Sequence, residues 1–60
     1  MKLYGVHPAS VRDGDRLCDD RMEAFATVVG NPWIDGSSVW AETDMIRVEF
    51  PSGSTVNIER

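Results

Sequence analysis

The chain has 60 residues, of which ten are acidic and six are Lys or Arg, giving a formal net charge of −4, and 42% of the residues are apolar. A chain of this length buries only about 60% of the surface that its unfolded form exposes, which argues against a roomy active-site cleft. A membrane span needs about 20 apolar residues, and the longest stretch without a charged side chain, residues 24–34, contains Gly30, Asn31 and Pro32. We therefore expect one domain over residues 1–60 and no membrane span.

The chain has too few cysteines and histidines for a disulfide or a zinc site. Cys18 is the only cysteine, which excludes an intrachain disulfide, and with His7 as the only histidine a Cys/His zinc site is excluded as well. Residues 1–8 contain one basic residue and no apolar run of the length that a secretory signal needs, so we expect a cytoplasmic protein without a cofactor. The fold must then hold by packing, alone or with self-association.

The first half of the chain predicts two strands separated by turns. Residues 7–11 are expected to be extended or to form one helical turn that begins near Pro8. Asp13-Gly14-Asp15 is a turn signal before a short strand at 16–18, and residues 19–22 follow as a loop. Residues 22–29 allow a partly helical reading, but the run of β-branched residues from Thr27 to Val29 favours a strand.

The second half predicts three more strands. We expect residues 31–34 to form a loop and Asp35-Gly36 to form a turn before a strand at 38–42. Residues 45–50 and 54–59 both alternate apolar with polar side chains, as half-buried strands do. Pro51 and Gly53 between them are suited to a tight turn, so these two segments are predicted to pair as a hairpin.

Five short strands about ten residues apart predict an all-β fold, a small antiparallel five-stranded barrel or strongly curled sheet. The barrel is expected over residues 11–59, after an extended N-terminal segment at residues 1–10. Curling lets the apolar sides of the strands face one another instead of water. The predicted core consists of Leu17, Ala26, Val28, Val39, Ile46, Val48, Phe50, Val56 and Ile58.

The order of these motifs resembles the small Src-homology-3-like barrels, including the Kyrpides-Ouzounis-Woese type. The heptapeptide Val11-Arg12-Asp13-Gly14-Asp15-Arg16-Leu17 is similar to the entry of those barrels into their first strand, and Ala26-Thr27-Val28-Val29 is similar to their second. Residues 46–50, with Gly53 and Val56, are similar to their later strands. The resemblance implies such a fold over residues 11–59, although the members that bind RNA or ribosomes present basic residues, of which this chain has few. The chain also resembles small uncharacterised proteins of actinobacterial tailed phages, which implies an accessory protein that acts on a host protein.

No motif indicates catalysis or metal binding. Five carboxylates lie within residues 13–23, but an EF-hand that began at Asp13 would place Cys18 where its loop needs Gly and Ala24 where it needs Glu. We expect a solvated turn with local ion pairs there. His7, Cys18 and Asp44 supply the residue types of a nucleophilic triad, but no nucleophile elbow or phosphate loop accompanies them, so we expect no enzyme.

The two tryptophans are the most informative residues for function. If Val39 and Ala41 face the core, then Trp40 faces outward, close to Trp33 and Ile34. Such an apolar patch is typical of a partner-binding site or a homodimer face, and the alternative is that Trp33 plugs an open end of the barrel. We predict a non-catalytic protein-interaction module with the contact residues Trp33, Ile34, Trp40, Glu42 and Asp44, in which the acids set specificity at the rim.

Three alternatives stay open at this point. Arg12, Arg16 and Arg47 are the candidates for a weak nucleic-acid-binding surface, which ten acidic residues oppose. The acidic surface is also consistent with a DNA mimic that inhibits a DNA-binding protein, although a charge of this size is ordinary for a small soluble domain. The third alternative is a homo-oligomer that pairs through its Trp-bearing face.

Overall fold

The structure is a computed structural model that describes all 60 residues, and it is all-β with two antiparallel sheets. The strands are β1 (Lys2–Val6), β2 (Arg16–Cys18), β3 (Ala24–Thr27), β4 (Trp33–Asp35), β5 (Ser38–Ala41), β6 (Val48–Phe50) and β7 (Val56–Glu59). The only helical element is the 3₁₀ turn η1 (Pro8–Ser10), which follows β1. No helix is long and apolar enough to cross a membrane.

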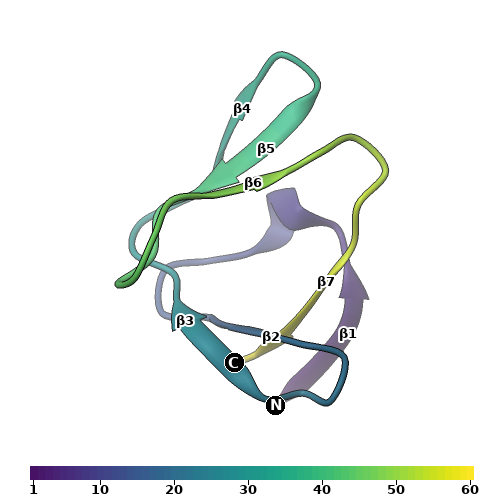
Figure 1. The fold of residues 1–60 in the computed structure, drawn as a ribbon, viewed down its shortest axis with the longest axis vertical. Coiled ribbons are helices and arrows are strands. Elements are labelled where there is room, and N and C mark those ends of the chain that lie inside the picture. The colour runs from purple at the N-terminus through teal and green to yellow at the C-terminus, as the bar shows by residue number, and fades with distance from the viewer.

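One sheet has the strand order β1-β7-β2-β3 and the other has the order β4-β5-β6. Figure 1 shows the first sheet in the lower part of the molecule and the β4–β5 hairpin projecting away from it at the upper end. A single antiparallel bridge between Val28 and Thr43 connects the segments that follow β3 and β5. Seven strands in two sheets replace the five predicted ones, and the closed barrel is not confirmed.

The predicted hairpin of residues 45–50 and 54–59 is wrong. The turn itself forms, because the N–H of Ser54 donates to the carbonyl of Pro51 at 3.1 Å and Gly53 has a φ of 85°. However, β6 pairs with β5, whereas β7 lies between β1 and β2. The chain therefore passes from one sheet to the other at this turn, since the turn residues determine the local bend and not the partners of the flanking strands.

The core lies mainly on the four-stranded sheet. Its buried cluster consists of Val11, Leu17, Val28, Val56 and Ile58, with Leu3, Val6, Val48 and Phe50 packed against it. Of the predicted core, Leu17, Ala26, Val28, Val39, Val56 and Ile58 are buried, and Val48 and Phe50 are half-buried. Cys18 is buried in β2 as a free thiol, as expected of a small apolar residue.

Ile46 was predicted to be in the core, but it is 66% exposed. The reason is the side chain of Thr43, whose hydroxyl oxygen accepts the N–H of Met45 at 3.1 Å and that of Ile46 at 2.9 Å. The same hydroxyl donates to the Ile46 carbonyl. Because these local bonds hold the backbone in a turn, the strand starts at Val48 and not at Met45.

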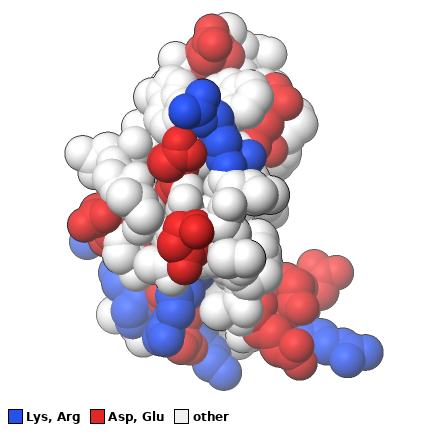
Figure 2. All heavy atoms as spheres, turned by 60° about the vertical axis from the view of Figure 1, so that its left-hand side comes forward, with Lys and Arg blue, Asp and Glu red and all other residues white.

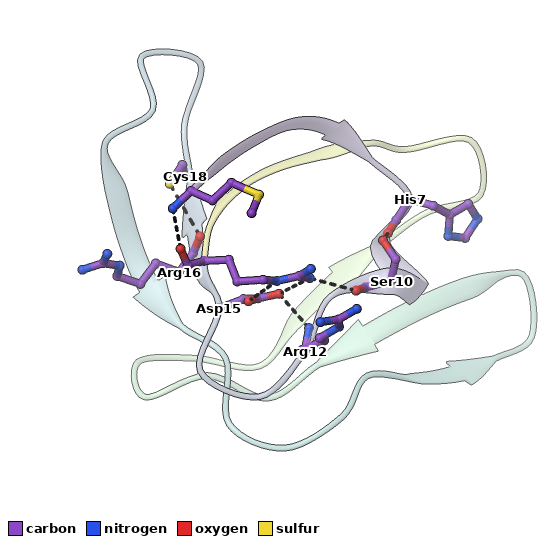
Figure 3. Close-up of polar contacts among 8 residues, drawn as sticks. His7, Ser10, Arg12, Asp15, Arg16 and Cys18 are labelled. Carbon is purple, nitrogen blue, oxygen red and sulfur yellow. Dashed lines mark hydrogen bonds and ion pairs between the residues drawn. The ribbon is translucent and has the colours of Figure 1, made fainter.

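Asp15 was predicted to lie in a solvated turn, but it is buried, with 2% of its surface exposed. Its carboxylate accepts the N–H of Arg12 at 2.8 Å and two bonds at 3.0 Å from Nε and Nη2 of Arg60, as the dashed lines of Figure 3 show around Asp15. The hydrogen bonds from Arg60 are the main reason why the pKa of Asp15 lies below its ordinary value, while burial opposes them. Arg60 also donates to the carbonyl of Ser10 at 3.3 Å, so the ion pair fastens η1 to the four-stranded sheet.

Candidate functional site

Three of the five predicted contact residues, Trp33, Ile34 and Trp40, lie in the β4–β5–β6 sheet, and Glu42 and Asp44 lie in the segment that follows β5. Trp33 and Ile34, expected in a loop, belong to β4, which pairs with β5 across the two-residue turn Gly36-Ser37. Trp33 is paired with Trp40, so the two indoles are neighbours on one face of the hairpin. Val39 and Ala41 are buried on the opposite face, as the alternation predicted. We call the face that carries Trp33 and Trp40 the outer face.

Charged side chains surround the tryptophans on the outer face. The guanidinium carbon of Arg47 lies 5.5 Å from the centre of the Trp33 ring, which is a cation–π contact. Arg47 also forms an ion pair with Glu42 at 3.1 Å. Glu49, which is paired with Trp40, accepts the hydroxyl of Ser38 at 2.7 Å. Figure 2 shows acidic and basic groups side by side toward the upper end of the molecule, where the hairpin lies.

Ile34 lies on the other face, because it is paired with Val39. It is nevertheless 69% exposed, since the hairpin projects past the core. On this side a cavity of about 270 Å³ is lined by Ala9, Pro32, Trp33, Ile34 and Val39. The indole N–H of Trp33 is the only polar group among these side chains, and ligand sites for drug-sized molecules span about 300–1,000 Å³, so the cavity matches one apolar side chain better than a substrate.

The wall of this cavity is partly built by η1. His7 precedes η1, and its Nδ1 accepts the N–H of Ala9 at 3.0 Å. The bond from Arg60 to the Ser10 carbonyl holds the same turn from the other end. The buried pair of Asp15 and Arg60, which sequence reasoning missed, therefore helps to position Ala9 in the cavity wall. No local sequence pattern indicates this ion pair, because 45 residues separate Asp15 from Arg60.

Asp44 forms hydrogen bonds with the main chain of β3. Its Oδ1 accepts the N–H of Thr27 at 2.8 Å, and its own N–H donates to the Thr27 carbonyl at 3.0 Å. These bonds connect the end of β3 to the loop after β5. The exposed carboxylate of Asp44 thus accepts a main-chain hydrogen bond from Thr27, whereas that of Glu42 forms an ion pair with Arg47 beside Trp33.

The three arginines of the nucleic-acid alternative do not form one set. Arg16 is paired with Glu59 at 2.7 Å in the four-stranded sheet, and Arg47 is paired with Glu42 beside the other sheet. The side chain of Arg12 takes part in none of the three ion pairs of the structure. No group of three or more His, Cys, Asp or Glu side chains is placed to hold a metal ion.

Comparison with known proteins adds no relationship, since no protein-family model, curated protein or solved structure matches the chain.

Proposed function

We propose that this protein is a non-catalytic interaction module that binds a partner protein through the β4–β5 hairpin. The observation that carries the proposal is the exposure of Trp33 (39%) and Ile34 (69%), consecutive residues of a strand that projects beyond the core. Tryptophan side chains that stay accessible beside an apolar cavity are typical of the anchors that carry much of the binding energy of protein interfaces.

The charged residues next to the anchors would select the partner. Glu42, Arg47 and Glu49 border the two indoles, and charges at an interface rim act mainly on association rate and on the choice of partner. We also propose that the fold is related to the Src-homology-3-like barrels. The partner would then be a host protein on which a phage-encoded accessory protein acts.

A comparison of two exposed aromatic residues tests the proposal. Immobilised wild type, Trp33→Ala and Tyr4→Ala would each be exposed to extract of the organism that encodes the protein. Tyr4 is the matched control, because it is 66% exposed on β1 in the other sheet. We expect a specific partner that Trp33→Ala loses and Tyr4→Ala retains, with circular dichroism showing that both variants are folded. Identical partner lists for all three proteins would contradict the proposal.

Salt dependence separates this proposal from its nucleic-acid alternative. Binding of labelled DNA and RNA would be measured at two salt concentrations, because affinity that rests on phosphate contacts falls steeply with salt. We expect no such binding. A steep salt dependence that Arg12→Gln, Arg16→Gln or Arg47→Gln reduces would favour the nucleic-acid alternative. Release of a DNA-binding protein from its DNA by the wild-type chain would favour the DNA mimic.

A further inference from the structure

Strand β4 has an unpaired edge with free main-chain groups. It is the terminal strand of its sheet, paired only with β5. Asp35 and Ser38 face each other across a two-residue turn and so form a hydrogen-bonded pair, and such pairs alternate along an antiparallel ladder. Ile34 therefore points its N–H and C=O away from β5, and no loop or side-chain hydrogen bond uses either group. This edge can accept another strand.

The exposed side chains of β4 lie on both faces of the sheet. Trp33 shares the outer face with Trp40, whereas Ile34 lies on the cavity side with Val39. A partner that packed flat on either face would reach only one of these residues. A partner strand beside the edge would instead present side chains alternately to both faces, and so contact Trp33 and Ile34 together.

We propose that the occupant of this edge is an extended segment of the partner protein that adds to β4 as a fourth strand, with an apolar residue opposite Ile34 and Lys or Arg residues on either side of it. The inference rests on the proposed function and specifies the chemistry of its partner. The apolar side chain would enter the cavity of about 270 Å³ next to Ile34. Main-chain hydrogen bonds would supply affinity, and the alternating side chains would supply specificity, as in other complexes formed by strand addition.

The negative charge near β4 is the reason for placing basic residues on the partner strand. It also argues against a second copy of this chain as the partner. Side chains that flank the apolar residue would face Trp33 and Asp35 on the outer face. Asp35 takes part in none of the ion pairs, whereas the ring of Trp33 already has the guanidinium of Arg47 at 5.5 Å. A cation on the added strand would therefore find its free carboxylate at Asp35. A second copy of this chain would bring no cation on β4 and would add its own net charge of −4.

Pro32 keeps the added strand short. It lies two residues before Ile34 on the same edge and has no N–H, so it contributes only a carbonyl acceptor. Only a few main-chain bonds are then available to the partner. We accordingly expect the side chains, and above all the residue in the cavity, to decide whether a segment binds.

The test uses an acetylated and amidated six-residue peptide of alternating lysine and valine, titrated into the labelled protein and followed by amide chemical shifts. The added strand is expected to run antiparallel to β4, like the other pairs of this sheet. When its valines face the cavity, their N–H groups then point toward β4 and those of the lysines point away. Backbone N-methylation of the valines should therefore weaken binding about tenfold or more, because it removes the donors to the edge. N-methylation of the lysines is the matched control and should change the affinity less than about threefold.

Two further arms complete the design. A glutamate–valine peptide should bind about tenfold more weakly than the lysine peptide, since it presents the wrong charge to Asp35. Ile34→Pro should bind the lysine peptide weakly or not at all, and it should fold, because the N–H that it removes is unpaired in the sheet. Equal affinities for the two methylated peptides, or for the two charge types, would overturn strand addition.

The outcomes separate the two proposals. If the peptide does not bind at millimolar concentration, but Trp33→Ala still loses a host partner that Tyr4→Ala keeps, strand addition fails and the interaction module stands. If the peptide does not bind and Trp33→Ala keeps every partner of the wild type, both proposals fail. A wild-type dimer in sedimentation experiments that Ile34→Pro converts to monomer would overturn the partner segment in favour of a second copy.

Discussion

Replacing Asp15 by Asn is expected to destabilise the protein by about 2 kcal/mol. The substitution keeps the shape and an acceptor for the Arg12 N–H, but it replaces a carboxylate oxygen by an NH₂ group that faces the guanidinium of Arg60. Hydrogen bonds to charged groups contribute about 1.5–3 kcal/mol each. The amide oxygen can keep the bonds that Oδ2 accepts, so one of the two bonds from Arg60 is lost, and we take about 2 kcal/mol for it because the Arg60 side chain is 29% exposed and can regain water.

The effect should be large for a domain of this size. A change of 1 kcal/mol moves the melting temperature of a small domain by about 4–8 °C, so Asp15→Asn should lower it by about 8–16 °C. Urea unfolding followed by tryptophan fluorescence would give the free energy, since Trp33 and Trp40 report on the sheet that does not contain the substitution. Coincident transitions by tryptophan fluorescence and by far-UV circular dichroism would indicate that the two sheets unfold together.

The matched control is Glu59→Gln, which makes the same carboxylate-to-amide change in an exposed ion pair. The side chains of Arg16 and Glu59 are 52% and 30% accessible, and exposed pairs contribute about 0–1 kcal/mol. Equal costs for Asp15→Asn and Glu59→Gln would refute the view that burial makes the Asp15 pair important.

The pH dependence gives a second check on the same residue. Asp15 has a pKa below its ordinary value of 3.8 in the folded state, so the unfolded chain takes up the proton first as the pH falls. Its contribution is therefore complete above about pH 4 and is lost as the pH falls through the folded-state pKa. The stability difference between wild type and Asp15→Asn should be constant near neutral pH and should shrink below about pH 4. A difference that persists unchanged in strong acid would refute the assignment.

Two further predictions concern packing and the turn before β6. Leu17→Ala, at a fully buried position, should cost about 2–5 kcal/mol in urea unfolding. Ile46→Ala, at an exposed one, should change stability by less than about 0.5 kcal/mol, and similar costs for both would contradict the observed core. Thr43→Val should cost about 1–2 kcal/mol, because it removes the hydroxyl that organises the turn. Thr55→Val, at an exposed position, is its control and should be nearly neutral in the same assay.

Local patterns predicted the local structure well. Alternation located β7, the turn at Asp35-Gly36 located the start of β5, and turn signals placed the bends at Gly14, Gly36 and Gly53. The strand favoured within residues 22–29 is β3, which ends at Thr27. The same alternation along residues 38–42 correctly separated Val39 and Ala41 from Trp40. These features depend on neighbours in sequence, which is why the sequence alone was sufficient for them.

Pairing between distant segments was not predictable in the same way. Nothing near residues 54–59 indicates that β7 pairs with β1 and β2 instead of β6. Likewise, the acids near Asp15 resemble a solvated turn until Arg60 is placed beside them. Trp33, Ile34 and Trp40, three of the predicted contact residues, lie on the β4–β5 hairpin, and the strand pairing shows that Trp33 and Ile34 face opposite sides of it.

The position of β7 has a consequence for how the protein folds. It follows every other strand in the sequence, yet it joins β1 to β2 in the middle of the four-stranded sheet. β1 has no strand partner, and β2 can pair only with β3, until residues 56–59 are present. Folding governed by such distant pairings takes about milliseconds to seconds in small β-proteins. During that interval β1 and β2 present unpaired edges to other chains, and synthesis rate and chaperone supply would govern the yield of native protein.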